Sequence, residues 1–159
     1  MGAAFFYHLT RNPLPVTLAS LAEKSLGAGW RVEVRGRSEA QLKSLDAALW
    51  LHEGFLPHGL AGGAHDAAQP ILLTTAVDGA SEGNDARCIM CVGGAEISPE
   101  DIAAADRVCI LFDGHDGAAL EHARGQWKSL TAAGTQAQYW SEESGKWQMK
   151  AQHPKPKEE

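Results

Sequence analysis

Four short runs of apolar residues constrain the fold of this chain more than any other feature. The runs cover residues 4–7, 71–73, 88–92 and 108–112 and show little or no alternation with polar residues. A strand stays apolar throughout when both faces of its sheet are covered, which is typical of parallel sheets. By contrast, residues 30–35 alternate strictly, which predicts a partly solvated strand nearer an edge of the sheet.

Helical signals separate these runs. The apolar residues Leu18, Leu21 and Leu26 stand at helical spacing, and later segments add capping patterns and glycine stops. The predicted helices begin near residue 18, at Ser38, at Ser98 and near Asp116; the second ends at Trp50 and the last before Gly134. A final strand is predicted over residues 136–140.

The alternation of strands and helices predicts a three-layer α/β sandwich of Rossmann-like type with a mostly parallel central sheet. A chain of 159 residues can form one domain with a core, which we place at residues 1–150. Residues 151–159 carry two prolines and alternating charge, which predicts a disordered C-terminal tail. Residues 59–69 and 78–85 are polar or rich in glycine and are predicted to be mobile loops.

The charge balance narrows the classes of partner. Fourteen Lys and Arg against twenty Asp and Glu give a net charge of −6, which repels nucleic-acid phosphate, so any direct contact with DNA is expected to be weak. No apolar run approaches the roughly 18–20 residues of a membrane span, and the first residues lack a secretory pattern. We therefore expect a cytoplasmic protein.

The cysteines and glycines give no sign of a metal or a cofactor. Cys88 and Cys91 form a C-x-x-C pattern, but an extended strand directs them to opposite faces, and no second Cys or His pair stands at zinc spacing. Together with Cys109 they are interpreted as buried structural thiols in a reducing compartment. A phosphate-binding loop is also missing from the sequence, because the glycine cluster at 59–63 matches no nucleotide-binding motif.

One pair of residues allows an enzymatic alternative. Asp113 and His115 follow the most apolar strand, where a carboxylate and an imidazole could share a proton. A small phosphate-transfer or hydrolytic enzyme would use this pair. The structural interpretation is favoured, with Asp116 capping the next helix and Asp113 closing the turn.

The last predicted helix carries a possible anion site. Arg124 and Lys128 lie four residues apart on one flank of Trp127. A peptide that ends in an aromatic residue and a free carboxylate would satisfy both the cations and the ring. The alternative is that Trp127 is a core residue and the two cations form a solvated face.

A second candidate surface follows the second predicted helix. Residues 49–51 and 54–58 crowd leucines and two large aromatics, Trp50 and Phe55, around a helix end and a loop. These side chains either form a partner patch or seal the bottom of the sheet, and the sequence leaves both interpretations open.

The chain resembles the chi subunit of bacterial DNA polymerase III over nearly its whole length. The resemblance rests on four segments, which are residues 5–7 (FFY), 45–50 (LDAALW), 55–62 (FLPHGLAG) and 124–128 (RGQWK) before Gly134. The D-x-A-L-W and F-x-P-H-x-L-A-G pair in this order is the specific part.

This resemblance implies a non-catalytic adaptor of the clamp-loader assembly in the cytoplasmic replisome, with the polymerase chemistry in other subunits. Such proteins link the small psi subunit to the acidic C-terminal tail of single-stranded-DNA-binding protein. By motif, Trp50 and Phe55 fall on the psi side, whereas Arg124, Trp127 and Lys128 fall on the helix that receives the tail. Thr131 stands where relatives can carry another cation, and Asp113 brings a carboxylate to the loop before this helix.

Overall fold

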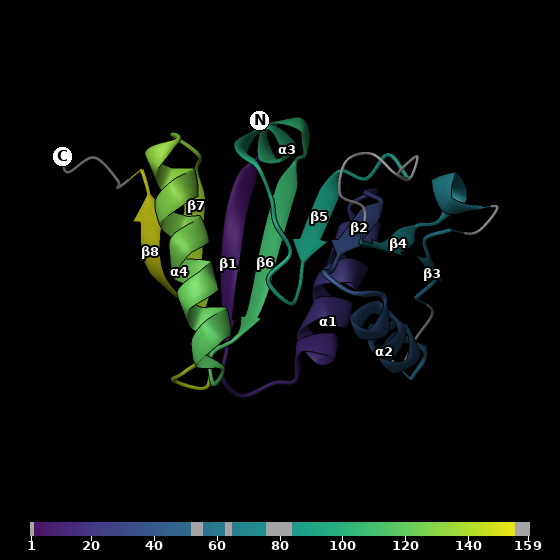
Figure 1. The fold of residues 1–159 in the computed structure, drawn as a ribbon, viewed down its shortest axis with the longest axis horizontal. Coiled ribbons are helices and arrows are strands. Elements are labelled where there is room, and N and C mark those ends of the chain that lie inside the picture. The colour runs from purple at the N-terminus through teal and green to yellow at the C-terminus, as the bar shows by residue number, and fades with distance from the viewer. Residues whose placement is uncertain (1, 52–55, 63–64, 76–83, 155–159) are drawn as a thin grey trace.

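Eight strands form a single sheet in the computed structural model of the chain, which describes residues 2–51, 56–62, 65–75 and 84–154 (Figure 1). In spatial order the strands are β3 (Gly59–Leu60), β4 (Ile71–Thr74), β2 (Val32–Arg35), β5 (Cys88–Cys91), β6 (Arg107–Asp113), β1 (Ala3–Leu9), β7 (Ala137–Ser141) and β8 (Gln148–His153). All neighbours pair in parallel except β7 and β8, which are antiparallel. The predicted mostly parallel sheet is therefore confirmed.

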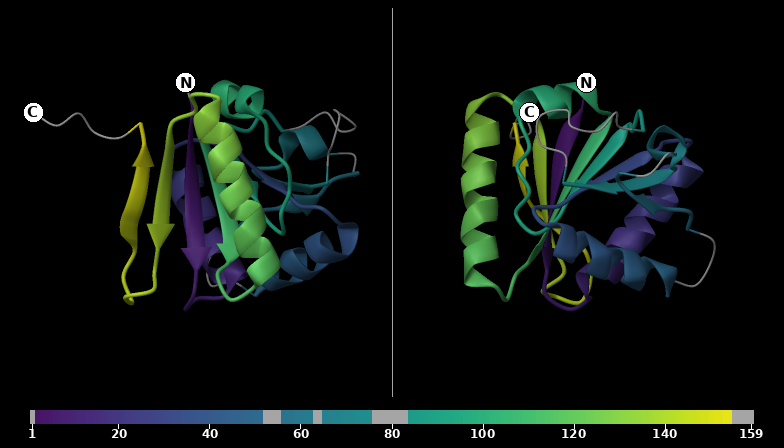
Figure 2. Two further views of the ribbon diagram at one scale, coloured as in Figure 1. Left: turned by 60° about the vertical axis from the view of Figure 1, so that its left-hand side comes forward. Right: turned by 45° about the vertical axis from the view of Figure 1, so that its right-hand side comes forward.

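Helices cover both faces of this sheet (Figure 2). They are α1 (Leu14–Gly27), α2 (Glu39–Trp50), α3 (Pro99–Ala104) and α4 (Gly117–Ala132), with a short 3-10 helix, η1 (Asp66–Ala68). Apolar residues of α1 and α2 share one core with the sheet, and those of α3 and α4 share a second core on the other face. Two cores on one sheet confirm the three-layer α/β sandwich.

The caps of two helices follow the sequence signals. The Ser38 hydroxyl accepts a hydrogen bond from the backbone N–H of Gln41 at the start of α2. At α3, Ser98 and Asp101 form a reciprocal capping box. Each cap satisfies backbone donors that have no partner inside the helix, so these residues define where the helices begin.

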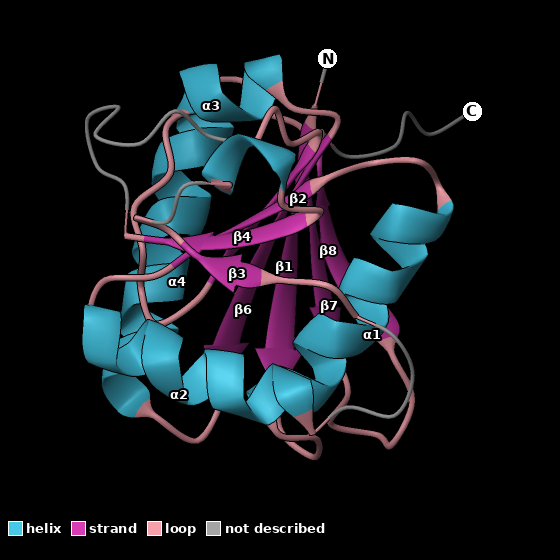
Figure 3. Cartoon of the chain, turned by 90° about the vertical axis from the view of Figure 1, so that its right-hand side faces the viewer, coloured by secondary structure: helices cyan, strands magenta, loops and turns pink. Residues whose placement is uncertain are grey.

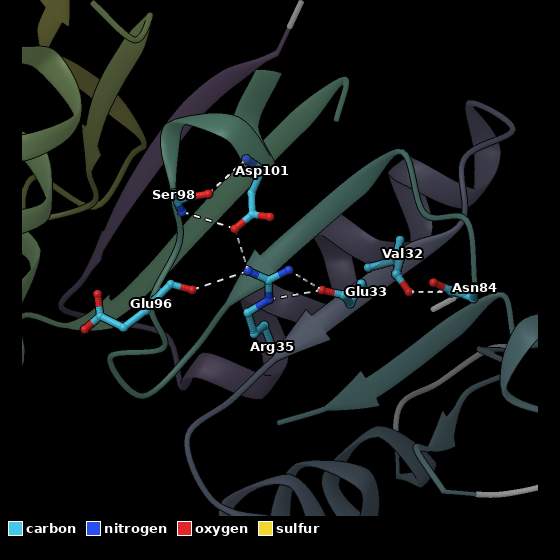
Figure 4. Close-up of polar contacts among 7 residues, drawn as sticks. All are labelled: Val32, Glu33, Arg35, Asn84, Glu96, Ser98 and Asp101. Carbon is cyan, nitrogen blue, oxygen red and sulfur yellow. Dashed lines mark hydrogen bonds and ion pairs between the residues drawn. The ribbon is translucent and has the colours of Figure 1, made fainter. Parts of the chain in front are cut away.

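The predicted partly solvated face of residues 30–35 is confirmed, because Glu33 and Arg35 of β2 are only partly buried. The strand lies further inside than expected, because β2 is third from the β3 edge, between β5 and β4 (β2, β4 and β3 are labelled in Figure 3). Its two polar residues are also paired. The Arg35 guanidinium donates to Glu33 at 2.8 Å and to Asp101 of α3 at 3.0 Å (Figure 4). Partial burial by itself would raise the pKa of Asp101, but the Ser98 N–H and Arg35 hold it below its usual range. Paired charges therefore let an alternating strand occupy an interior position.

The two edges of the sheet come from segments that carry weak strand signals. β3 occupies two residues of the predicted loop 59–69, and η1 occupies three more. The antiparallel strand β8 was missed because its residues are mostly polar and exposed. β8 includes residues 151–153, so the predicted tail is corrected there, whereas residues 155–159 lie outside the described residues.

Asn84 shows how the predicted loop 78–85 rejoins the fold. The residue is buried, and its amide donates to the backbone carbonyl of Val32 at 3.0 Å (Figure 4). The same amide donates to the carbonyl of Gln69 at 2.8 Å. The contact joins the segment before β5 to β2. Residues 78–83 of this loop lie outside the described residues.

The cysteines occupy the two cores as their spacing predicts. Cys88 and Cys109 lie in the α1–α2 core, and Cys91 lies in the α3–α4 core. All three thiols are free and buried, and burial raises the pKa of Cys91 to about 12. Within the described ranges, no group of three or more His, Cys, Asp or Glu side chains could hold a metal ion, and no helix is long and apolar enough to cross a membrane.

Candidate partner-binding surfaces

Helix α4 lies across the face of the sheet opposite α1 and α2 (Figure 2). Its N-cap is Asp116, whose carboxylate accepts from the backbone N–H groups of Ala118 and Ala119, as the sequence predicts. The helix buries Ala123, Gln126 and Leu130 against the sheet. This orientation leaves the flank with Arg124 and Lys128 exposed to solvent.

Trp127 lies half-buried at the border between the α3–α4 core and the surface. Its ring contacts Phe6 of β1 at a centroid distance of 5.3 Å and Tyr139 of β7 at 6.0 Å, both nearly edge to face. Trp127 is therefore partly a core residue, and its role as a ligand wall stays a prediction. The sequence analysis missed Phe6 and Tyr139 as partners of Trp127, because they are distant in the chain and meet only through the sheet.

The two cations lie beside this aromatic group. The Arg124 side chain is 61% exposed and pairs loosely with Glu121 at 3.3 Å. Burial raises the pKa of Tyr139, and the positive charge of Arg124 opposes this rise. The Lys128 ammonium has no ion-pair or hydrogen-bond partner in the described part of the chain.

Thr131 and Asp113 are the two departures noted in the sequence, and the structure shows where each side chain lies. The Thr131 hydroxyl donates to the carbonyl of Trp127 at 2.8 Å, so it is already satisfied by the helix backbone. Asp113 precedes the N-cap, and Arg124 lies eight residues beyond Asp116, which is about 12 Å along a helix axis. The carboxylate of Asp113 therefore stands at the other end of the helix from Trp127.

Asp113 and His115 do not share a proton. The carboxylate of Asp113 accepts from the backbone N–H of His115 at 2.9 Å, and His115 Nε2 lies 2.8 Å from the carbonyl of Thr10. Each side chain is thus bound to the backbone, which supports the structural interpretation.

The same turn lies beside the crevice where open α/β sheets bind ligands, and its Asp113 and Asp116 line a pocket of about 210 Å³ at the carboxyl ends of β5 and β6. The crevice lies at the carboxyl ends of β1 and β6, because α1 leaves β1 on one face and α4 leaves β6 on the other. There the Gly114 N–H donates to the Leu9 carbonyl at 2.7 Å. A Cβ on Gly114 would collide with the ring of His8, so the chain itself packs this position closely.

Trp50 lies on a different surface, at the C-terminal end of α2. Its side chain is 67% exposed and that of Leu51 is 86% exposed, whereas Leu49 is buried. The indole packs over the ring of His58 at a centroid distance of 4.5 Å. Trp50 and Leu51 therefore form an exposed apolar patch rather than a seal for the sheet, and Phe55 lies outside the described residues.

His58 supports the indole from below. The residue is buried, with Nε2 at 3.1 Å from the Asp46 carboxylate and Nδ1 at 2.7 Å from the Leu56 carbonyl. These contacts join the segment after α2 to the helix. The buried His58 ring under the Trp50 indole is therefore held in place by these contacts.

Comparison with known proteins identifies the family. No curated protein sequence matches the chain. The family model described as DNA polymerase III chi subunit, HolC, matches residues 1–138, which include both surfaces. Since this match covers most of the 159 residues, the chain belongs to the chi-subunit family of DNA polymerase III, an accessory subunit of that polymerase.

Proposed function

We propose that this chain is a non-catalytic adaptor of the polymerase III clamp-loader assembly in the cytoplasmic replisome. It joins the psi subunit to the acidic C-terminal tail of single-stranded-DNA-binding protein and meets DNA only indirectly. The observation that carries this proposal is the exposed guanidinium and ammonium of Arg124 and Lys128 beside the half-buried ring of Trp127.

The chemistry of this surface suits the end of an acidic peptide. A terminal carboxylate accepts charge-assisted hydrogen bonds from Arg124, which is planar and offers paired donors. The aromatic side chain of the last residue packs against Trp127. Acidic residues further upstream are attracted by Lys128, so binding weakens as salt shortens the Debye length below about 10 Å.

Titration calorimetry with two peptides tests the tail site. One peptide is acidic and ends in an aromatic residue with a free carboxylate, and the other is its C-terminal amide. Losing a charge-assisted hydrogen bond costs roughly 1.5–3 kcal/mol, so amidation or Arg124→Ala weakens binding by about one to two powers of ten. Arg37→Ala removes an exposed arginine just before α2 and leaves the affinity unchanged. Equal affinities for the free-acid and amidated peptides would contradict the proposal.

The psi side is assigned to Trp50 and Phe55. An exposed aromatic residue beside Leu51 is a suitable hot spot, and losing it costs about 2 kcal/mol of affinity for a clamp-loader partner. Trp50→Ala and Phe55→Ala are therefore expected to weaken psi binding and to retain tail-peptide binding. Retained psi affinity in both variants would contradict this assignment.

The absence of catalysis is supported by the hydrogen bonds of Asp113 and His115, both of which engage the backbone. We expect the isolated protein to show no nucleotidyltransferase, ATPase or hydrolase turnover. Turnover that disappears in His115→Ala or Asp113→Asn would overturn this part of the proposal.

A further inference from the structure

A pocket of about 370 Å³ lies between α1 and the strands β1 and β7. It opens on the face of the sheet opposite α4 and is distinct from the tail and psi surfaces. Three aromatic side chains line it, Tyr7 of β1, Trp140 of β7 and Trp147 of the turn after β7. Trp140 and Trp147 lie beyond residue 138, where the family match ends, so this chain builds the pocket partly from a segment that the family model does not cover.

The aromatic wall of the pocket is held in place by buried contacts. The ring of Trp147 meets Tyr7 edge to face at a centroid distance of 5.4 Å. The turn that carries Trp147 begins at Glu142, which is 2% exposed and whose Oε1 accepts from the backbone N–H groups of Thr10, Arg11 and Asn12 at 2.8–3.0 Å. The wall is therefore formed before any ligand arrives, which reduces the entropy that binding must lose.

The lining of the pocket combines a cation with uncharged polar groups, of which the Asn12 amide already donates to Glu142 at 2.8 Å. Lys24 of α1 is the charged residue of the lining, and no carboxylate of the described residues lines the pocket. Neither the Lys24 ammonium nor the Tyr7 hydroxyl has a hydrogen-bond or ion-pair partner within the described ranges. On a chain with a net charge of −6, this pocket is thus locally suited to an anion.

We propose that this pocket binds a small aromatic anion of the nucleoside monophosphate class. The planar ring stacks against Trp147 and Trp140, and the phosphate accepts from Lys24 and Tyr7. Ser20 and Asn12, which also line the pocket, suit the hydroxyl groups of a sugar. The volume lies at the lower end of the range for small-molecule sites, which fits one ring system with one anionic group.

Tryptophan fluorescence of the full chain provides the test, because Trp140 and Trp147 line the site. AMP is expected to quench the emission in a saturable manner, with adenosine binding about tenfold more weakly and inorganic phosphate not competing at equal concentration. Trp147→Ala lowers the affinity for AMP about tenfold, as expected for a lost stacking partner. Lys24→Gln has a similar effect, whereas Lys43→Gln removes the same charge from α2 and changes nothing.

Trp147→Ala could lose AMP binding because it misfolds, so Trp147→Phe, which keeps an aromatic ring, serves as the control. Its affinity for AMP is measured by calorimetry. This variant is expected to bind within about threefold of the parent chain. Three results would overturn the proposal. They are no saturable binding of AMP by the parent chain, binding that survives Trp147→Ala, and displacement of AMP by the acidic tail peptide. Binding of an aryl carboxylate in place of AMP would equally contradict the nucleotide class.

Discussion

Trp127 and Trp50 each carry a proposed partner surface, yet their surroundings are opposite. Trp127 is half-buried and meets Phe6 and Tyr139 from two strands of the sheet. Trp50 is 67% exposed at a helix end and packs only over His58 among the ring contacts of the described residues. Trp127 therefore contributes to the core as well as to a surface, whereas Trp50 contributes mainly to a surface.

This difference separates two kinds of interface. Where an aromatic residue belongs to the core, its removal changes the stability of the fold as well as the affinity for a partner. Where an aromatic residue is mostly exposed, its removal changes the affinity for a partner with little effect on the stability of the fold. The contrast can be measured, because unfolding and binding report on different contacts.

Trp127→Ala has the largest expected effect. The variant loses the edge-to-face contacts with Phe6 and Tyr139 and leaves a cavity beside the α3–α4 core, at a cost of about 3 kcal/mol in the free energy of unfolding. Urea denaturation measures this loss. Trp127→Phe restores part of it, and an unchanged unfolding midpoint in Trp127→Ala would remove the contrast with Trp50.

Glu142→Gln tests the rigidity of the β1–β7 region and comes next. Burial by itself would raise the pKa of Glu142, but the N–H groups of Asn12, Arg11 and Thr10 and the Asn12 amide lower it below its usual range. Losing a charged acceptor for these donors costs about 2 kcal/mol of stability at pH 7.

The pH dependence of this effect follows from the direction of the pKa shift. A carboxylate with a lowered folded-state pKa stabilises the fold fully above its unfolded pKa of about 4.3, and this contribution is lost as the pH falls through the folded pKa. The stability difference between the parent and Glu142→Gln is therefore constant from pH 7 to about 5.5 and shrinks below about pH 4. Glu143→Gln, at an exposed neighbour, shows no such difference, and a difference that grows in acid would contradict the assignment.

Trp50→Ala is expected to change stability by less than about 0.5 kcal/mol, because most of its indole is already in water. Thermal unfolding measures this directly beside Trp127→Ala. A loss of several kcal/mol would show that Trp50 is a core residue after all. That result would also remove the basis for assigning it to the psi side.

Lys128→Ala has a small expected effect on affinity and tests the α4 side of the comparison. An exposed ammonium without a fixed partner is a hydrated point charge, so its removal weakens tail-peptide binding by only about threefold. Calorimetry at low and high salt measures the change. If Lys128→Ala weakens binding more than Arg124→Ala, the carboxylate contact belongs to Lys128 instead.

The sequence alone was sufficient for elements whose signals are local. Unbroken apolar runs indicated strands covered on both faces, and the side chains of Ser38, Ser98 and Asp116 marked where helices begin. The helical spacing of Arg124, Trp127 and Lys128 placed them together on α4. These predictions hold because each depends on neighbours within one or two turns of the chain.

Tertiary structure decided everything that depends on distant partners. Strand β2 lies inside the sheet between β4 and β5, and its Arg35 pairs with Asp101, which lies 66 residues away. Edge strand β8 forms through its backbone ladder with β7, which needs no apolar pattern. Sheet order is set by long-range pairing, and a sequence window does not contain the partner strand.

The same division holds for the surfaces. Composition and apolar patterning indicated an acidic α/β chain, the resemblance of four segments indicated the chi family, and helical spacing placed two cations beside a tryptophan on the last helix. Only the fold decided that Trp127 is anchored by Phe6 and Tyr139, that Trp50 stays exposed, and that Tyr7, Lys24 and Trp147 enclose a pocket. The physical reason is that burial depends on which distant side chains arrive at the same place, and that is a property of the packed sheet rather than of any local pattern.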